Sequence, residues 1–186
     1  AAVIGRNTGA DSNYVWLTGV GTRWFIGGDL FVGSNGSFNR LVISNGATVT
    51  NNGNGYIGYG SGSSNNVVLV TGAGSLWTNS GNVNIGSVSA FNQLVISNGG
   101  VVAGNGGVVG SGSTSSNNVV LVTGAGGLHV PCPTGLMPRA ALGALVDVEI
   151  GLGIALDDHR AVGQHGDVPA HHHALREGLV RLHGEC

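Results

Sequence analysis

An internal repeat constrains the fold of this chain more than any other feature of its sequence. Residues 66–77 read Asn-Val-Val-Leu-Val-Thr-Gly-Ala-Gly-Ser-Leu-Trp, and near copies begin at Asn13 and Asn118. The first two copies lie 53 residues apart and the next two lie 52 apart, so the one-residue difference is expected in a loop. Self-similarity at a fixed period of this size is typical of chains that stack one structural unit on the next.

Each 53-residue unit contains two related halves. Each half begins with an apolar residue and a glycine, continues through a polar, glycine-rich link, and ends with an apolar run and another glycine. The glycines that open successive halves are separated by 28, 25, 28 and 24 residues, and they are Gly5, Gly33, Gly58, Gly86 and Gly110. A half-repeat of about 26 residues is therefore predicted to form one structural coil.

The apolar runs predict strands rather than helices. They are short, rich in Val, Ile and Leu, bounded by Asn, Gly, Ser and Thr, and show no helical periodicity through residue 126. Such strands could form an antiparallel sandwich, but the fixed period favours a parallel β-helix in which each coil adds one strand to each sheet. Residues 1–126 are thus predicted to be an all-β β-solenoid, and five coils would span only about 24 Å.

Glycine and asparagine mark the corners of the expected coils. Glycine readily adopts positive φ, and asparagine tolerates the left-handed region better than most residues. Asn45 and Asn98 occupy the same place in their repeats. We expect both to stand at one corner of the solenoid, where they serve the turn and hydrogen-bond between coils.

The composition changes sharply near residue 127. All seven His, all four Pro and both Cys lie beyond it, whereas every Asn, Ser, Trp, Tyr and Phe lies before it. The third copy of the repeat loses its motif at His129, where the other copies have Trp. Residues 127–186 are therefore treated as an atypical tail, irregular or partly helical, with a short amphipathic segment at 170–182. Three origins stay open: a shifted reading frame, a disordered segment, or a cap on the solenoid.

Charge and hydropathy argue against nucleic-acid binding and against a transmembrane helix. The net charge is −2 and the chain contains no lysine, so it lacks the clustered basic face of a nucleic-acid binder. No run of eighteen apolar residues occurs, so no transmembrane helix is expected. The first residues already belong to the repeat, which suggests a fragment of a longer protein whose targeting segment lies elsewhere.

The repeat region has few groups that could catalyse a reaction. Its only carboxylates are Asp11 and Asp29, accompanied by three arginines, whereas polysaccharide-cleaving β-helices use clustered acids, a basic residue or a metal. One pair such as Asp29 and Arg40 is usually solvated surface. We therefore expect no enzymatic activity.

Three motifs suggest cofactors or metals without matching them. Residues 120–127 resemble the phosphate loop of short-chain dehydrogenases, but the later glycines are missing and the stretch recurs at solenoid spacing. Residues 104–107 resemble calcium-binding glycine-rich repeats, but no Asp is nearby to supply a hard ligand. His171–173 and the nearby tail carboxylates could bind zinc or nickel, but their spacing fits no standard site. No cofactor or metal is expected.

Four aromatic residues are candidates for a ligand platform. Trp24 and Trp77 follow the turn after the Thr-Gly strand, and Tyr56 and Tyr59 lie at the start of the central repeat. Each Trp is either an aromatic packed beneath a loop or an exposed surface on which sugar rings stack. The 26-residue coil would place the two indoles two coils apart, about 10 Å, so they would not touch.

The units resemble the repeats of long bacterial surface proteins, a family associated with type V secretion (autotransporter passengers) and with PEP-CTERM sorting signals. The resemblance covers residues 1–126 and is carried by 56–60, 68–77, 82–86 and 92–100. It implies an exported, elongated parallel β-helix and brings no catalytic motif.

The resemblance and the residues lead to one expected function and one alternative. The expected function is a non-enzymatic structural or adhesive segment, a rigid stalk or passenger that is secreted or held at the cell surface. Its partners would be surface glycans or neighbouring repeats of the same protein. The alternative is a carbohydrate-binding or carbohydrate-active module that uses Trp24, Trp77, Tyr56 and Tyr59 as sugar platforms.

Overall fold

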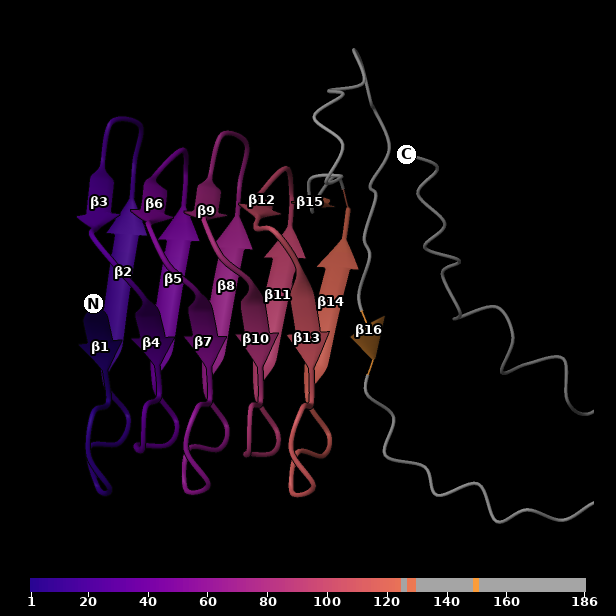
Figure 1. Cartoon of the computed structure of the whole chain (residues 1–186). Helices are drawn as coiled ribbons and strands as arrows, with labels where there is room; N and C mark the ends of the chain where they lie inside the picture. Colours follow the sequence, from indigo (N-terminus) through magenta and orange to yellow (C-terminus); the bar gives the residue numbers. More distant parts are fainter. Residues whose placement is uncertain (125–126, 130–148, 151–186) are drawn as a thin grey trace, which may run out of the picture.

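A computed structural model describes residues 1–124, 127–129 and 149–150. Its strands wind as a β-solenoid of five coils, which confirms the predicted fold class (Figure 1). Each coil contributes one strand to each of three parallel sheets. In coil order the strands are β1 (Ala2–Ile4), β2 (Tyr14–Thr18), β3 (Arg23–Ile26); β4 (Leu30–Val32), β5 (Arg40–Ser44), β6 (Thr48–Asn51); β7 (Gly55–Ile57), β8 (Val67–Thr71), β9 (Leu76–Asn79); β10 (Val83–Ile85), β11 (Gln93–Ser97), β12 (Val101–Ala103); β13 (Gly107–Val109), β14 (Val119–Thr123), β15 (Gly127–His129).

The three sheets run along the solenoid, with one strand from every coil. The first, called sheet A, has the order β1-β4-β7-β10-β13 and adds β16 (Glu149–Ile150) beyond β13. Sheet B has the order β14-β11-β8-β5-β2, and sheet C has the order β15-β12-β9-β6-β3. Equivalent residues of successive coils are paired without slippage, for example Leu41 with Val68 and Val68 with Leu94. The half-repeat seen in the sequence is therefore the structural coil.

Alternate residues of the strands fill the interior. In sheet B the buried positions are Val68 and Val70, stacked on Leu41 and Ile43 of the preceding coil, and all four are 0% exposed. Successive side chains of a strand point to opposite faces, so one residue in two enters the core. Burying each such side chain stabilises the fold by about 1.5–3 kcal/mol. The stack of Val, Leu and Ile is therefore the main apolar core.

A ladder of asparagines, which the sequence reasoning missed, runs through the interior at the corner between sheets A and B. From the second coil on, the side-chain Oδ1 of one Asn accepts hydrogen bonds from both the backbone N–H and the Nδ2 of the equivalent Asn one coil earlier. The Nδ2 donors and Oδ1 acceptors lie 2.8, 3.1, 3.1 and 3.2 Å apart. The members are Asn13, Asn39, Asn66, Asn92 and Asn118.

The ladder is buried in its middle three coils. Asn39, Asn66 and Asn92 are each 0% exposed. A buried amide is costly unless its donors and acceptor are paired, and here they are. Among the residues that the structure describes, the only buried side-chain nitrogen or oxygen without a partner is Asn79 Oδ1, which lies outside the ladder.

The repeating glycines make room for this ladder. Gly33 has a φ of +78°, and a Cβ added to it would lie 2.2 Å from Asn66 Nδ2. Gly58 meets Asn92 in the same way at φ +74°. Both the left-handed backbone and the close approach exclude a side chain. The apolar-Gly pair and the Asn are thus two halves of one packing unit.

The predicted corner asparagines also bridge coils. Asn45 and Asn98 follow sheet B in coils 2 and 4, with φ of 54° and 51°. Their Nδ2 atoms donate to the hydroxyls of Thr18 at 3.0 Å and Thr71 at 3.3 Å in the preceding coils. The expected turn role and inter-coil hydrogen bonds are therefore confirmed.

The structure adds a strand at the point where the repeat motif fails. Residues 127–129, assigned to the tail on composition, form β15 and pair with β12. Leu128 is 5% exposed and joins the core beneath sheet C. The predicted segment at 170–182, the histidines at 171–173 and both cysteines lie outside the described residues. Among the described residues no helix is long and apolar enough to cross a membrane.

Candidate functional site

Trp77 is a core residue. It is 0% exposed, and its indole N–H donates to Asn51 Oδ1 at 2.9 Å. A Cβ on Gly55 would lie 2.5 Å from the indole, so that glycine leaves the space which the ring fills. Neither face of the ring is open to a ligand. A sugar-platform role for Trp77, one alternative of the sequence analysis, is therefore wrong because the side chain points into the solenoid.

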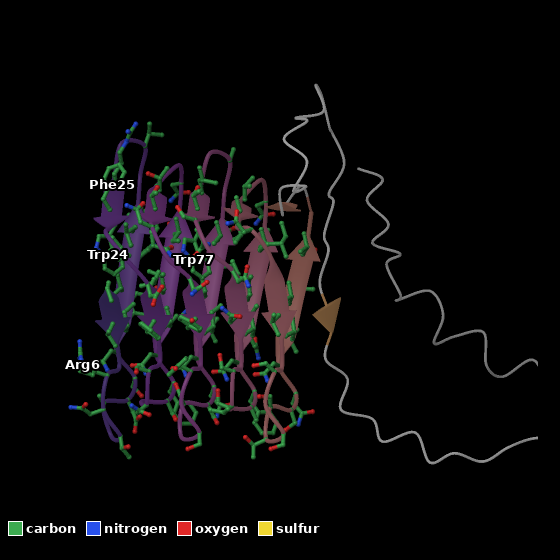
Figure 2. The ribbon with its side chains drawn as sticks, in the orientation of Figure 1. Arg6, Trp24, Phe25 and Trp77 are labelled. Carbon is green, nitrogen blue, oxygen red and sulfur yellow. The ribbon has the colours of Figure 1, made fainter. Side chains whose placement is uncertain are left out.

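Trp24 belongs to the same inward column of sheet C. The register runs from Trp24 through Val49 to Trp77, which confirms that the two indoles are two coils apart (Figure 2). Trp24 is partly buried and packs against the core at its N-terminal end. Its inward direction favours a packing role over a ligand platform.

Tyr56 and Tyr59 form a cluster with Phe31 on the outer side of sheet A. The Phe31 and Tyr56 rings are stacked, with centroids 4.7 Å apart and planes 10° apart. Tyr59 stands edge-on to both, at 5.3 Å from Phe31 and 5.0 Å from Tyr56. Phe31 and Tyr56 are partners across β4 and β7, so each covers one face of the other. Tyr59, at 46% exposed, is the most accessible of the four candidate platform residues.

The hydroxyl of Tyr56 sits among polar groups at the edge of this cluster. It accepts a hydrogen bond from Asn54 Nδ2 at 3.1 Å. Burial, reinforced by the nearby Asp29 carboxylate, raises the pKa of Tyr56, and the Asn54 hydrogen bond opposes the shift. Tyr56 therefore stays a neutral phenol at physiological pH and serves as an aromatic surface rather than as a base.

The two carboxylates of the repeat region accept backbone hydrogen bonds from loops of the next coil. Asp11 Oδ1 accepts the backbone N–H of Ser37 at 2.6 Å, and Asp29 Oδ1 accepts that of Asn54 at 2.7 Å. Each ties its own coil to the next, and they lie in different links of coil 1. Within the described ranges, no group of three or more His, Cys, Asp or Glu side chains is placed to hold a metal ion. The carboxylates thus have structural partners in the fold.

Sequence reasoning missed one interior feature and one surface that the fold creates. The asparagine ladder was visible as Asn residues spaced 26, 27, 26 and 26 apart. The outer face of sheet B, described below, was hidden because its strands are apolar on both sides and show no alternation. No family model, curated protein or solved structure matches this chain.

Proposed function

We propose that the solenoid is a non-enzymatic structural or adhesive segment, acting as a rigid stalk or passenger of a secreted or surface-attached bacterial protein. The observation that carries this proposal is the asparagine ladder. It links each coil to the next through two hydrogen bonds to one Oδ1, in addition to the three parallel strand pairings. Such a stack resists bending and lengthens by about 4.8 Å per coil. The resemblance of the units to surface-protein repeats supports the exported setting.

A deletion in phase with the coils tests the stalk role. Removing residues 55–106 joins Asn54 to Gly107, which is equivalent to Gly55 in sheet A, and so deletes coils 3 and 4. We expect the remaining solenoid to fold and to shorten by about 10 Å in small-angle X-ray scattering. Loss of strand content in circular dichroism would contradict a modular spacer.

Protease treatment of intact cells tests the location. An epitope-tagged parent protein in its own host should be cleaved on whole cells if the segment is displayed at the surface. Protection on intact cells, with cleavage only after lysis, would refute the surface assignment. Recovery of the tag from the medium would indicate the secreted form.

The carbohydrate-binding alternative now depends mainly on Tyr59 and its neighbours. The cluster of Phe31, Tyr56 and Tyr59 is aromatic and partly exposed, as sugar-stacking surfaces are. However, the stacking of Phe31 on Tyr56 uses ring faces that a sugar would need. Glycan-array binding that is lost in Tyr59→Ala would favour this alternative, and unchanged binding would exclude the cluster.

A further inference from the structure

The outer face of sheet B carries an unbroken apolar column. At the central outward position of each strand, one residue from every coil is in register with the next. The members of this column, called the B-column, are Trp16, Val42, Leu69, Val95 and Leu121. Trp16 is 61% exposed and Leu121 is 48% exposed, whereas the members between them are more covered by their neighbours. The B-column therefore presents apolar side chains to solvent at Trp16 and Leu121 and partly at Leu69 and Val95, whereas Val42, at 5% exposed, is buried between its neighbours.

The columns on either side carry almost no charge. One side consists of hydroxyl residues, and the Trp16 indole N–H donates to one of them, Ser44 Oγ, at 3.0 Å. The other side has a single charged residue, Arg40. In register the flanking columns are Thr18, Ser44, Thr71, Ser97, Thr123 and Tyr14, Arg40, Val67, Gln93, Val119. A flat, nearly uncharged face around an apolar centre has the composition of the buried part of an interface.

Two phenylalanines border this face in a disfavoured backbone conformation. Phe38 and Phe91 precede β5 and β11, have φ of 59° and 60°, and are 58% and 48% exposed. The other three coils place Ser12, Asn65 and Asn117 at this corner, also with positive φ. A bulky residue is uncommon in the left-handed region, and strain of this kind gathers at binding sites. Both rings are therefore exposed apolar groups at the corner that leads into sheet B.

We propose that the outer face of sheet B binds the same face of a second copy of this chain. The B-column alternates large and small side chains, from Trp16 and Val42 to Leu69, Val95 and Leu121. A two-fold axis parallel to the strands reverses the coil order of the second copy. After a shift of one coil, Trp16 then meets Val95 of the second copy and Leu69 meets Val42. The column is self-complementary in this arrangement.

The size of the face fits a reversible dimer. Five strands at about 4.8 Å, each five residues long at about 3.3 Å per residue, make a face of about 24 by 17 Å. The shift of one coil pairs four of the five strands, about 19 by 17 Å, so the two faces bury on the order of 650 Å² without the bordering phenylalanines, well below the roughly 1,200–2,000 Å² of specific, stable interfaces. The association of this chain is therefore weak and concentration-dependent. It strengthens with every coil that a longer solenoid adds.

A second copy fits the face better than a glycan. The B-column is made of Val and Leu between its ends, and these side chains offer no ring faces on which sugars stack. Arg40, Gln93 and Tyr14 are the only flanking residues with long side chains that carry polar groups, and Tyr14 lies at one end of the face. A sugar chain would need polar partners along its whole length, whereas an apolar face can pack against another apolar face without them. This proposal does not depend on export or on a stalk role.

Sedimentation velocity of the full chain tests the proposal. The average mass should rise with concentration from the 18.5 kDa monomer toward twice that value. Leu69→Asp, at the centre of the B-column, should raise the dissociation constant by at least about tenfold. Leu76→Asp is the matched control, because Leu76 is an equally half-buried, outward Leu of the same coil on sheet C. It should leave the association unchanged.

Two further variants distinguish this interface from nonspecific association and from misfolding. Val95→Phe adds apolar surface but breaks the large-small alternation, so it should weaken the dimer, whereas nonspecific association would strengthen. Leu69→Thr introduces a β-branched, strand-favouring but polar residue and should also weaken the dimer, with circular dichroism unchanged. A wild-type chain that stays monomeric overturns the proposal, as do equal effects of Leu69→Asp and Leu76→Asp. Retention of a monomeric wild type on cellulose, lost in Leu69→Asp, would show that the face binds a glycan instead.

Discussion

Replacing Asn66 with alanine tests whether the asparagine ladder holds the coils together. Asn66 is 0% exposed, and its Oδ1 accepts the backbone N–H of Asn39 at 2.9 Å and Asn39 Nδ2 at 3.1 Å. Asn66→Ala leaves both buried donors without this acceptor. Each unpaired buried group costs about 1–3 kcal/mol, so the two together lower the free energy of unfolding by about 2–6 kcal/mol. Most domains have only about 5–15 kcal/mol in total, so this loss is large.

Asn13→Ala is the matched control within the same ladder. Asn13 is exposed and is the first member, so it loses only the Nδ2 bonds to the Ala10 carbonyl and to Asn39 Oδ1. Its backbone N–H still donates to Asn39 Oδ1 at 3.0 Å. No buried donor is left unpaired, and the expected loss is about 0.5–1 kcal/mol. The two variants remove the same type of side chain, and they differ in whether buried hydrogen-bond donors are left without an acceptor.

Urea unfolding, followed by far-ultraviolet circular dichroism and by tryptophan fluorescence, measures both variants. Two probes are needed because repeat proteins can lose two-state behaviour, and a single free energy holds only where the curves coincide. We expect Asn66→Ala to unfold at clearly lower urea than Asn13→Ala. If their free energies of unfolding agree within about 1 kcal/mol, buried amide pairing does not stabilise the stack and the reasoning fails.

Three other predictions address the packing and the charge of the coils. Gly58→Ala should destabilise strongly, because its Cβ would lie 2.2 Å from Asn92 Nδ2, and a cycle with Asn92→Ala should be non-additive in urea unfolding; simple additivity would contradict the contact. Trp77→Ala should cost about 3–5 kcal/mol of unfolding free energy and Trp77→Phe distinctly less; equal costs would mean that the Asn51 hydrogen bond outweighs packing. Burial and Asp29 raise the pKa of Tyr56 in the folded state. The neutral phenol therefore stabilises the fold fully below the unfolded pKa of about 10, and this stabilisation is lost as the pH rises through the folded pKa. Asp29→Asn should shift the tyrosinate absorbance titration to lower pH, and an unchanged titration would contradict this electrostatic coupling.

The coil could be predicted because glycine spacing reports backbone geometry directly. Gly33 and Gly58 need positive φ and have no room for a side chain, so the chain cannot place another residue there. Asn45 was predicted correctly for a related reason, since its left-handed φ of 54° is a local property of the turn. Features that depend on one residue's own backbone can be inferred without knowing its neighbours.

The side chains of the candidate site could not be predicted in the same way. Trp77 is buried because the facing position holds Gly55, and that pairing exists only once the coil has closed. Asn66 is buried although asparagine is mostly a surface residue, because stacking supplies partners from the coils before and after it. Both outcomes depend on contacts between residues more than twenty positions apart, which the local pattern does not contain.

The two-coil period of the sequence is present in the core as well as on the surface of the solenoid. The asparagine ladder recurs in every coil, so it requires only a period of about 26. The inward columns instead alternate over two coils, and they read Trp24, Val49, Trp77, Val102 in sheet C and Leu41, Val68, Leu94, Val120 in sheet B. The links from sheet A to sheet B alternate between nine and seven residues, for example 58–66 and 86–92. The bordering Phe38 and Phe91 and the alternating sizes of the B-column follow the same rhythm. A period shared by the core and the surface indicates that two coils pack as one unit, in which a large buried side chain such as Trp77 lies between the smaller Val49 and Val102.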